Sequence, residues 1–366
     1  MRRSAPFLMA ALTAVALFLA PVPAHADAVT PSFADDLEAQ SWLLTDSRGR
    51  VLASANADKS MEPASTTKIM TAMVVLDSGV SMDTAYTVPE MPSDWENPQL
   101  AGYEAGTTAT VRDLLEVMLV YSANDAAQTL AVGLAGSIDA FADLMNQKAH
   151  EIGMTATTFK NPSGMEEAGH TSTATDLVTM GRYALDNYPF IARMVRTHEV
   201  TVPVNGVDKA FESTDALMPV YPALIGIKTG AVSAGYAFLG AARSDGVTLY
   251  SCVLGCPTPW GRFQDTLDLM QWAYARYASL TFAKEGQVLG WRPFAFRFGY
   301  MVPVVWDQTV SGPVWPDGGA TTYSRVVPAS DQLMVPGEQC GASLWTQDGR
   351  TVAAGSLSVA RAVVRA

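Results

Sequence analysis

Apolar side chains recur with two different spacings in this sequence, and the change of spacing predicts where strands and helices lie. Two short apolar runs within residues 41–53 flank Asp46-Ser47-Arg48-Gly49, which predicts a β-hairpin with turn residues at its centre. Residues 66–76 instead repeat their apolar side chains at helical spacing and stop before Gly79. We therefore expect Ser65 at the start of a helix.

The middle third of the chain has helical spacing. A second helix is predicted to begin at Thr110, whose hydroxyl can cap it, and its buried stripe consists of Leu114, Leu115, Met118 and Leu119. Further helices are predicted over residues 125–134, 138–152 and 174–185.

Strand-like patterns return after Ala223. Strands are predicted over residues 224–229, 236–242 and 247–254, with Ser244-Asp245-Gly246 as the turn between the last two. A long amphipathic helix, residues 263–278, follows. An early hairpin, a helical block, several strands and a closing helix together predict an α+β fold, with an antiparallel sheet sandwiched by helices.

Beyond about Leu280 the sequence is rich in Val, Pro, Gly and aromatic residues and has no helical period. Short strands broken by turn residues are typical of a small β domain. The chain is also longer than one hydrophobic core usually organises. We therefore predict two domains, over residues 27–282 and 283–366, the second a small C-terminal β domain.

The first 26 residues have the order of a secretory signal peptide. Arg2 and Arg3 precede an apolar run over residues 7–20, and small residues end at Ala24-His25-Ala26. The alternative, a membrane anchor, is disfavoured because the apolar run is too short to span a bilayer comfortably. The mature protein is therefore expected to be exported and to act outside the cytoplasm.

Composition narrows the classes of partner and cofactor. The formal net charge is −12 and no basic block is present, which argues against binding nucleic acid because phosphate binding needs clustered Lys and Arg. With 49% hydrophobic and 16% charged residues, the chain has the composition of a packed globular protein. The four histidines lack metal-ligand spacing, so we expect no metal site and no cofactor.

The three cysteines, Cys252, Cys256 and Cys340, cannot form an even disulfide framework. Cys252 and Cys256 lie in one predicted strand, in which four residues separate α-carbons by roughly 13 Å. A bond between them would require the chain to fold back. We interpret all three as packing residues.

The first candidate for chemistry is Ser65-Thr66-Thr67-Lys68. A hydroxyl and an amine three residues apart at a helix start share one face and can hydrogen-bond. A neutral lysine can take the proton of a serine nucleophile if burial or a neighbouring cation lowers its pKa. Alone, this spacing is common and usually marks an exposed pair.

Two further motifs change that judgement. Ser122-Ala123-Asn124 lies between two predicted helices, and Lys228-Thr229-Gly230 lies on a predicted strand. The three motifs in this order are typical of penicillin-binding proteins and class A β-lactamases. Together, in a chain expected to be exported, they favour a serine acyl-transfer enzyme with Ser65 as its nucleophile.

With these motifs the chain resembles the low-molecular-mass penicillin-binding proteins that act as D-alanyl-D-alanine carboxypeptidases, serine peptidase family S11. The resemblance covers roughly residues 35–280 and rests on residues 63–72, 122–126, 161–165 and 226–230. It implies a β-lactamase/transpeptidase-like fold followed by a small β domain. It also implies peptidoglycan stem peptides ending in D-Ala-D-Ala as substrates, β-lactam antibiotics as covalent inhibitors, and a location at the cell wall or the outer face of the cytoplasmic membrane.

The resemblance also implies roles for the motif residues near the nucleophile. Ser65 would form the acyl-enzyme, with Lys68 as its base. Ser122 would pass a proton toward the leaving D-alanine, and Asn124 would hold the backbone of the substrate. The amides of Ser65 and Ala231 would form the oxyanion hole.

At the other end of the substrate, Lys228 and Thr229 would face the terminal carboxylate. Gly230 would leave room for the substrate to lie against the strand. Arg262 occupies the place where family members often add an arginine for the carboxylate, since a guanidinium matches a carboxylate bidentately. The alternative for Arg262 is a solvated residue near a helix start.

Two features depart from the family pattern. Many relatives end in an amphipathic membrane helix, whereas residues 358–366 are short and weakly amphipathic, so peripheral membrane association is left open. Ala231 is small and apolar where relatives often have a polar side chain.

Two other functions are weighed against the carboxypeptidase. A class A-like β-lactamase needs a glutamate that activates water, and Glu166 and Glu167 are interpreted instead as loop surface, with His170 where that enzyme's motif would place Asn. A non-catalytic β-lactam sensor is normally tied to a transmembrane segment, and none is visible in the sequence after residue 26.

Overall fold

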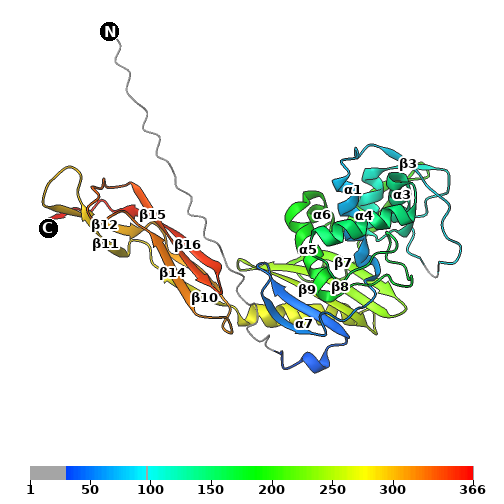
Figure 1. The fold of residues 1–366 in the computed structure, drawn as a ribbon, viewed down its shortest axis with the longest axis horizontal. Coiled ribbons are helices and arrows are strands. Elements are labelled where there is room, and N and C mark those ends of the chain that lie inside the picture. Colours follow the sequence, from blue (N-terminus) through cyan, green and yellow to red (C-terminus); the bar gives the residue numbers. More distant parts are fainter. Residues whose placement is uncertain (1–29, 96–97, 366) are drawn as a thin grey trace, which may run out of the picture.

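The computed structural model describes residues 30–95 and 98–365 (Figure 1). The predicted signal peptide, residues 1–26, lies outside the described residues. Within the described part of the chain, no helix is long and apolar enough to cross a membrane.

A central antiparallel sheet organises the first part of the chain, with strand order β2-β1-β9-β8-β7. The predicted early hairpin and the three later strands are confirmed. The hairpin joins the sheet through β1 against β9, with Ser41 opposite Leu254 and Asp46 opposite Leu249. The strands are β1 (Ser41–Asp46), β2 (Val51–Ala55), β7 (Leu224–Val232), β8 (Gly235–Ser244) and β9 (Val247–Cys256).

Helices cover both faces of this sheet, as predicted. Alternation along β1 sends Trp42 and Leu44 into one core with Phe263 of α7, and sends Leu43 into the opposite core beneath α5 and the helical block. Figure 1 shows α7 on one side of the sheet and the other helices on the opposite side. The helices are α1 (Lys68–Asp77), α2 (Val111–Val120), α3 (Asn124–Ala135), α4 (Ile138–Glu151), α5 (Ala174–Asn187), α6 (Pro189–Met194) and α7 (Gly261–Arg276).

The helix starts follow the expected capping chemistry with one difference. Thr110 caps α2, since the Asp113 amide donates to its hydroxyl at 3.1 Å. The helix predicted from residue 66 instead begins with a 3₁₀ turn, η2 (Ala64–Thr67), and becomes α-helical at Lys68. Ser65 therefore lies in the tighter turn that precedes α1.

Several short elements were not predicted. The alternating exposed and buried residues of β5 follow a pattern of residue types that is visible in the sequence. Together with the Asn205-Gly206 turn after the strand, this pattern is a hairpin signal. The short β3–β4 pair and α6 have too few residues to show a period. These elements are η1 (Ala34–Asp36), β3 (Ala85–Thr87), β4 (Thr108–Thr110), α6, β5 (Glu199–Val204) and β6 (Val207–Glu212).

The three cysteines are free thiols, and Cys252 and Cys256 are buried packing residues, as predicted. Cys252 lies in the core beneath α5, whereas Cys256 lies in the core beneath α7. A bulge causes this change of face, because the register of β8 and β9 shifts between Phe238 and Tyr236 where Gly255 has φ 71°. Burial raises the pKa of both thiols.

The C-terminal part is a β domain, as predicted. Its larger sheet has the order β11-β12-β16-β15-β14 with β17 added to β12, and β10 pairs with β13 beside it. Trp306, Trp345 and Leu357 are central to its core. The boundary after residue 282 stays a prediction. The strands are β10 (Ala278–Ala283), β11 (Val288–Pro293), β12 (Tyr300–Trp306), β13 (Val310–Val314), β14 (Thr321–Val326), β15 (Gln339–Gln347), β16 (Arg350–Val359) and β17 (Val364–Arg365).

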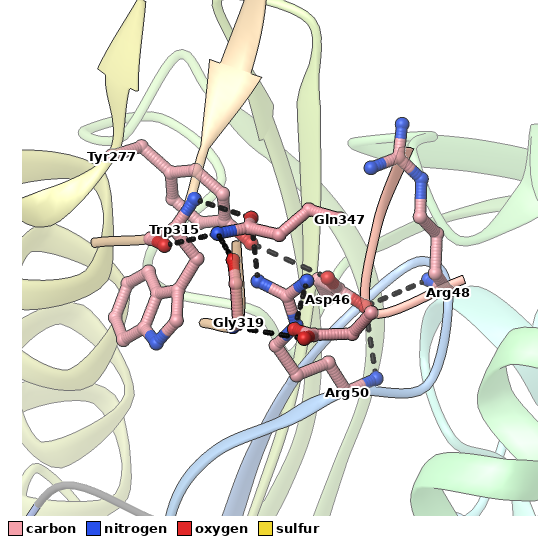
Figure 2. A network of polar contacts seen from close by, with 8 residues as sticks. Asp46, Arg48, Arg50, Tyr277, Trp315, Gly319 and Gln347 are labelled. Carbon is pink, nitrogen blue, oxygen red and sulfur yellow. Dashed lines mark hydrogen bonds and ion pairs between the residues drawn. The ribbon is translucent and has the colours of Figure 1, made fainter. Parts of the chain in front are cut away.

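A polar network joins the first hairpin to the β domain (Figure 2). Arg50, in the turn between β1 and β2, binds Asp348 at 2.9 Å and Gln347 at 3.2 Å. The buried Gln347 amide also accepts from the Trp315 amide and donates to the carbonyls of Trp315 and Gly319. The Trp315 ring packs 5.0 Å from that of Tyr277, so apolar and polar contacts fix the same junction.

Gln347→Leu should destabilise the protein by about 2–4 kcal/mol, because the Trp315 amide and two backbone carbonyls would lose their partners in a buried site. Urea and thermal unfolding would measure the change. Gln339→Leu, at an exposed position on the same strand, is the matched control. Equal effects of the two substitutions would contradict a structural role of this network.

Candidate functional site

The motif residues meet in one cleft of about 480 Å³. Ser65 of η2, Ser122 of the α2–α3 loop and Asn124 of α3 line one part of it. Thr229 to Ser233 of β7 and its following turn, together with Arg262 of α7, line another part. Residues that are up to 197 positions apart in sequence therefore share one cavity.

Lys68 lies directly behind Ser65 and is fully buried. Its Nζ is 3.0 Å from Ser65 Oγ, 2.6 Å from Asn124 Oδ1 and 2.6 Å from the carbonyl oxygen of Ser163. Three separate segments of the chain therefore converge on this one amine.

The surroundings of Lys68 favour its neutral form. Burial lowers its pKa well below the ordinary value, and the charge of Lys228 lowers it further, while Asp125 acts in the opposite direction. The Asp125 carboxylate is occupied by the backbone amides of Ala101, Gly102 and Tyr103. An amine without a paired carboxylate at this depth is poised to accept a proton.

Asn161 organises the loop that brings the Ser163 carbonyl to Lys68. Its Oδ1 accepts hydrogen bonds from the amides of Ser163 and Gly164, and its Nδ2 donates to the Met165 carbonyl. The side chain thus replaces the hydrogen bonds that a regular element would supply. The loop is anchored to α1 because Thr71 donates to the carbonyl of Pro162 at 2.6 Å.

Two residues beside the nucleophile have unfavourable backbone conformations. Ala64, just before Ser65, has φ 51°, and Ser122 has φ 72°. Residues with a Cβ rarely adopt this left-handed region, and such strain is concentrated at functional sites. At Ser122 the unusual conformation comes where the chain leaves α2 and enters α3, and it places this serine on the wall of the cleft.

The strand motif buries its lysine under the cleft. Lys228 is 2% exposed, and its ammonium contacts the Thr229 carbonyl at 3.2 Å. The Thr229 hydroxyl is also hydrogen-bonded to Thr214. Burial and then the charge of Arg262 lower the pKa of Lys228 to about 7, with Asp215 acting against them.

The backbone packing around Gly230 is unusually close. A Cβ at this position would lie 2.8 Å from the Cβ of Ala64 and 3.3 Å from the Ser65 amide nitrogen. Glycine is therefore required so that β7 can approach the turn that carries the nucleophile. The next residue, Ala231, is exposed on the cleft wall.

Arg262 is bound into the wall of the cleft. Its Nη1 donates to the Gly230 carbonyl at 2.6 Å, and its guanidinium lies over the rings of Tyr236 and Phe263. Arg262 lies in the first turn of α7, which begins at Gly261 and not at the predicted residue 263, and its side chain turns toward β7.

The acidic loop after the Asn161 segment makes specific contacts. Glu166 and Glu167 are exposed, yet Glu166 accepts a hydrogen bond from the Ser233 amide and Glu167 accepts one from Asn161. His170 is buried and joins Thr67 to the Lys160 amide, and burial lowers its pKa to about 4. Among residues 30–95 and 98–365, no cluster of three or more His, Cys, Asp or Glu could hold a metal ion.

Comparisons with known proteins agree on one family. A family model described as D-alanyl-D-alanine carboxypeptidase, peptidase family S11, matches residues 27–258. The chain belongs to this family. D-alanyl-D-alanine carboxypeptidase DacF of Bacillus subtilis is 32% identical over 260 residues, which cover 69% of this chain. The same region spans 66% of that relative, so just under two thirds of its length is matched.

Solved structures extend the likeness to the fold. Penicillin-binding protein 5 of Haemophilus influenzae has a TM-score of 0.65 over 92% of this chain and 99% of its own, at 24% identity, and shows the same architecture including the β domain. Penicillin-binding protein D2 of Listeria monocytogenes, solved in an ampicillin-bound form, is 33% identical with a TM-score of 0.58. That alignment covers 64% of this chain and 97% of the Listeria chain.

The family motifs did not point to Asp215, which lies near both cations of the cleft. It is 8% exposed, its Oδ1 accepts from the Leu217 amide at 3.0 Å, and its Oδ2 has no hydrogen-bond partner among the described residues. Burial raises its pKa to about 6, although Lys228 and Arg262 partly offset this. A lone acidic residue in a loop carries no recognisable sequence signal.

Asp215→Asn should stabilise the fold above neutral pH. Because the pKa of Asp215 is higher in the folded state, the protein binds this proton more tightly when folded, so ionisation of Asp215 costs stability as pH rises from about 4 through 6. Asparagine keeps the hydrogen bond to Leu217 and removes the charge. We expect a gain of up to about 3 kcal/mol at pH 7.5 that disappears near pH 4.

Urea unfolding of both proteins between pH 4 and pH 8 tests this expectation. Asp208→Asn, at an exposed position on β6, serves as the control. A stability difference that does not change with pH would contradict the assignment of a perturbed carboxyl group at position 215.

Proposed function

We propose that this protein is a serine-type D-Ala-D-Ala carboxypeptidase that removes the terminal D-alanine from peptidoglycan stem peptides. The observation that carries the proposal is the fully buried Lys68 with its amine 3.0 Å from the Ser65 hydroxyl, in a cleft that also contains Ser122 and Arg262. Family membership supports the same reaction.

Lys68 would act as the base that activates Ser65. A neutral amine has two hydrogens and one lone pair. The oxygens of Asn124 and Ser163 can accept both hydrogens, which leaves the lone pair for the Ser65 hydroxyl. The lowered pKa makes the neutral form accessible near neutral pH.

The reaction would proceed in two steps through an ester. Ser65 Oγ attacks the carbonyl carbon of the penultimate D-alanine as its proton moves to Lys68, and the amides of Ser65 and Ala231 stabilise the oxyanion. Ser122 relays a proton to the nitrogen of the departing D-alanine, and the peptide bond breaks. Water then attacks the ester, which releases the shortened peptide and returns the proton to Ser65.

Substrate binding would use β7 together with residues of α3 and α7. Asn124 would hold the substrate backbone, and Gly230 brings the strand close to the nucleophile. Lys228, Thr229 and Arg262 would bind the terminal carboxylate, although in the present arrangement Arg262 donates to the Gly230 carbonyl.

A β-lactam would acylate Ser65 and remain attached, which makes it a covalent inhibitor. The carboxylates of Glu166 and Glu167 already accept hydrogen bonds from Ser233 and Asn161, and His170 is bound to Thr67. This arrangement favours the carboxypeptidase over a β-lactamase, which needs a glutamate free to activate water.

The site of action is proposed to be the cell wall or the outer face of the cytoplasmic membrane. The family acts outside the cytoplasm, and the signal-like residues 1–26 support export. Peripheral association with the membrane stays a hypothesis.

The purified protein should release D-alanine from a peptide ending in D-Ala-D-Ala, and Ser65→Ala should abolish both this release and covalent labelling by a fluorescent penicillin. The same hydroxyl must attack both carbonyls. Folding of the variant is checked by its unfolding transition. Labelling that survives in Ser65→Ala would place the nucleophile elsewhere.

Arg262→Ala should lower kcat/KM on a free-acid substrate roughly ten- to a hundredfold, since a charge-assisted hydrogen bond contributes about 1.5–3 kcal/mol. It should change little on the same peptide with an amidated C-terminus, which the wild type should handle poorly. The kcat/KM values of the two enzymes on the two substrates form a thermodynamic cycle, which isolates the contact between Arg262 and the terminal carboxylate. An equal loss on both substrates would show that Arg262 does not bind the carboxylate.

A further inference from the structure

Lys228 is a buried cation without a contacting counter-ion. Its side chain is 2% exposed, and its ammonium contacts the carbonyl and the hydroxyl of Thr229 at 3.2 and 3.5 Å. Among residues 30–95 and 98–365, no carboxylate forms an ion pair with it. The charge of Arg262 also acts against its ammonium form. An amine in such a setting loses its proton readily.

The proposed reaction nevertheless needs Lys228 in its charged form. A neutral amine would not attract the terminal carboxylate of a substrate, and it would no longer help to lower the pKa of Lys68. A carboxylate in direct contact with Lys228 would compete with the substrate for its donors. Lys228 therefore requires a counter-charge that acts without contact.

Asp215 shares a small cavity with Lys228. The cavity has a volume of about 10 Å³ and is also lined by Ser213, Thr214 and Thr229. Its remaining lining is apolar and comes from α2, from the end of α6 with the residue after it, and from β7: Leu119, Val120, Met194, Val195 and Ile227. Among the described residues of this wall, only Asp215 and Lys228 carry charge.

One oxygen of Asp215 is buried without a partner. Oδ1 accepts from the Leu217 amide at 3.0 Å, whereas Oδ2 has no hydrogen-bond partner among the described residues. A cavity of about 10 Å³ is close to the space that one water molecule needs, and the hydroxyls of Ser213 and Thr214 add polar partners. A water molecule in this cavity can link the carboxylate to the ammonium of Lys228.

The loop that carries Asp215 is fixed to β7. The Asp215 amide donates to the Ser213 hydroxyl at 3.2 Å, and the Leu217 amide holds Oδ1. The hydroxyls of Thr214 and Thr229 are hydrogen-bonded at 2.5 Å, which joins the loop to the strand that carries Lys228. The carboxylate is therefore held in place before a substrate binds.

We infer that Asp215 is a positioning residue that keeps Lys228 in its ammonium form across the small cavity beneath Thr229, and that it thereby maintains binding of the substrate's terminal carboxylate. The inference rests on the proposed carboxypeptidase function. It gives a role to a buried carboxyl group that none of the proposed catalytic steps uses.

The neighbouring charges set the direction of the pH dependence. Asp215 is influenced by Lys228 and Arg262. Lys228 is influenced by Asp215 and Arg262, and its own charge acts on Lys68. Burial raises the pKa of Asp215 to about 6, so it is ionised where Lys228, with its pKa lowered to about 7, loses its proton. Because the carboxylate opposes this loss, Asp215→Asn should move the deprotonation of Lys228 to lower pH.

NMR of the protein labelled with ¹³Cε-lysine measures this directly. The Lys228 signal is assigned by its absence from Lys228→Arg, and it is followed from about pH 5 to pH 10. The apparent pKa of Lys228 should be about one unit lower in Asp215→Asn than in the wild type. Asp208→Asn, which removes an exposed carboxylate from β6, is the matched control and should leave the titration unchanged.

Kinetics test the consequence for substrate binding. The substrate is Nα,Nε-diacetyl-L-Lys-D-Ala-D-Ala, as the free acid and with an amidated C-terminus. At pH 8, Asp215→Asn should lower kcat/KM on the free acid about five- to tenfold, mainly through KM, and at pH 5.5 by less than about twofold. On the amidated peptide the loss at pH 8 should be at least about threefold smaller, because no terminal carboxylate needs Lys228.

The outcomes separate the two proposals. If the pKa of Lys228 is the same in Asp215→Asn and the wild type, or if the variant loses equally on both peptides or at both pH values, the inference about Asp215 is wrong and the carboxypeptidase function stands. If the wild type releases no D-alanine from the free acid, the proposed function itself fails.

Discussion

The burial of Lys68 is the constraint on which the site depends. A fully buried amine must have hydrogen-bond partners, and here these come from η2, from α3 and from the loop around Ser163. Hydrogen bonds to the same atom, Lys68 Nζ, therefore hold all three segments in position. Asn161 holds the loop, and the strained residue Ala64 turns the chain so that Ser65 faces the amine. The surroundings that favour an unprotonated Lys68 are thus already in place before any substrate binds.

The charges of the cleft are divided along β7. Lys228 and Arg262 lie near Thr229 and Gly230 within the strand, whereas Glu166 lies at Ser233, just after the strand ends. In a chain with a net charge of −12, these two cations thus lie where the proposed function places the anionic terminus of a substrate. Lys228 serves this arrangement twice, because its charge also helps to keep Lys68 neutral.

Much of this arrangement could be predicted from the sequence, because its signals are local. Ser65, Lys68, Ser122 and Lys228 lie in short motifs, and the strands and long helices show clear periods. The pairing of β1 with β9 could not be predicted, since nothing local in residues 41–46 specifies a partner some 200 residues later. The buried carboxyl group of Asp215 was missed for the same reason, because its neighbours come from other parts of the chain.

Some of the packing could not be predicted from the sequence. The missing Cβ of Gly230 makes room for Ala64, and room for a substrate beside this glycine stays a prediction. The bulge at Gly255 reverses the face of Cys256 and places the two nearby cysteines in separate cores, which a strict alternation could not anticipate.

The pairing of β1 with β9 also determines the order in which the chain can fold. Until Cys256 has been synthesised, β1 has no partner on that side, and its unsatisfied backbone groups form an open edge that can pair with other chains. Folding is slow because the long loop between β1 and β9 must close, at a cost in conformational entropy, before the contacts between the two strands stabilise the fold. The N-terminal hairpin therefore lacks its partner strand while most of the polypeptide is being synthesised. Agents that bind and shield extended segments should raise the yield of native protein.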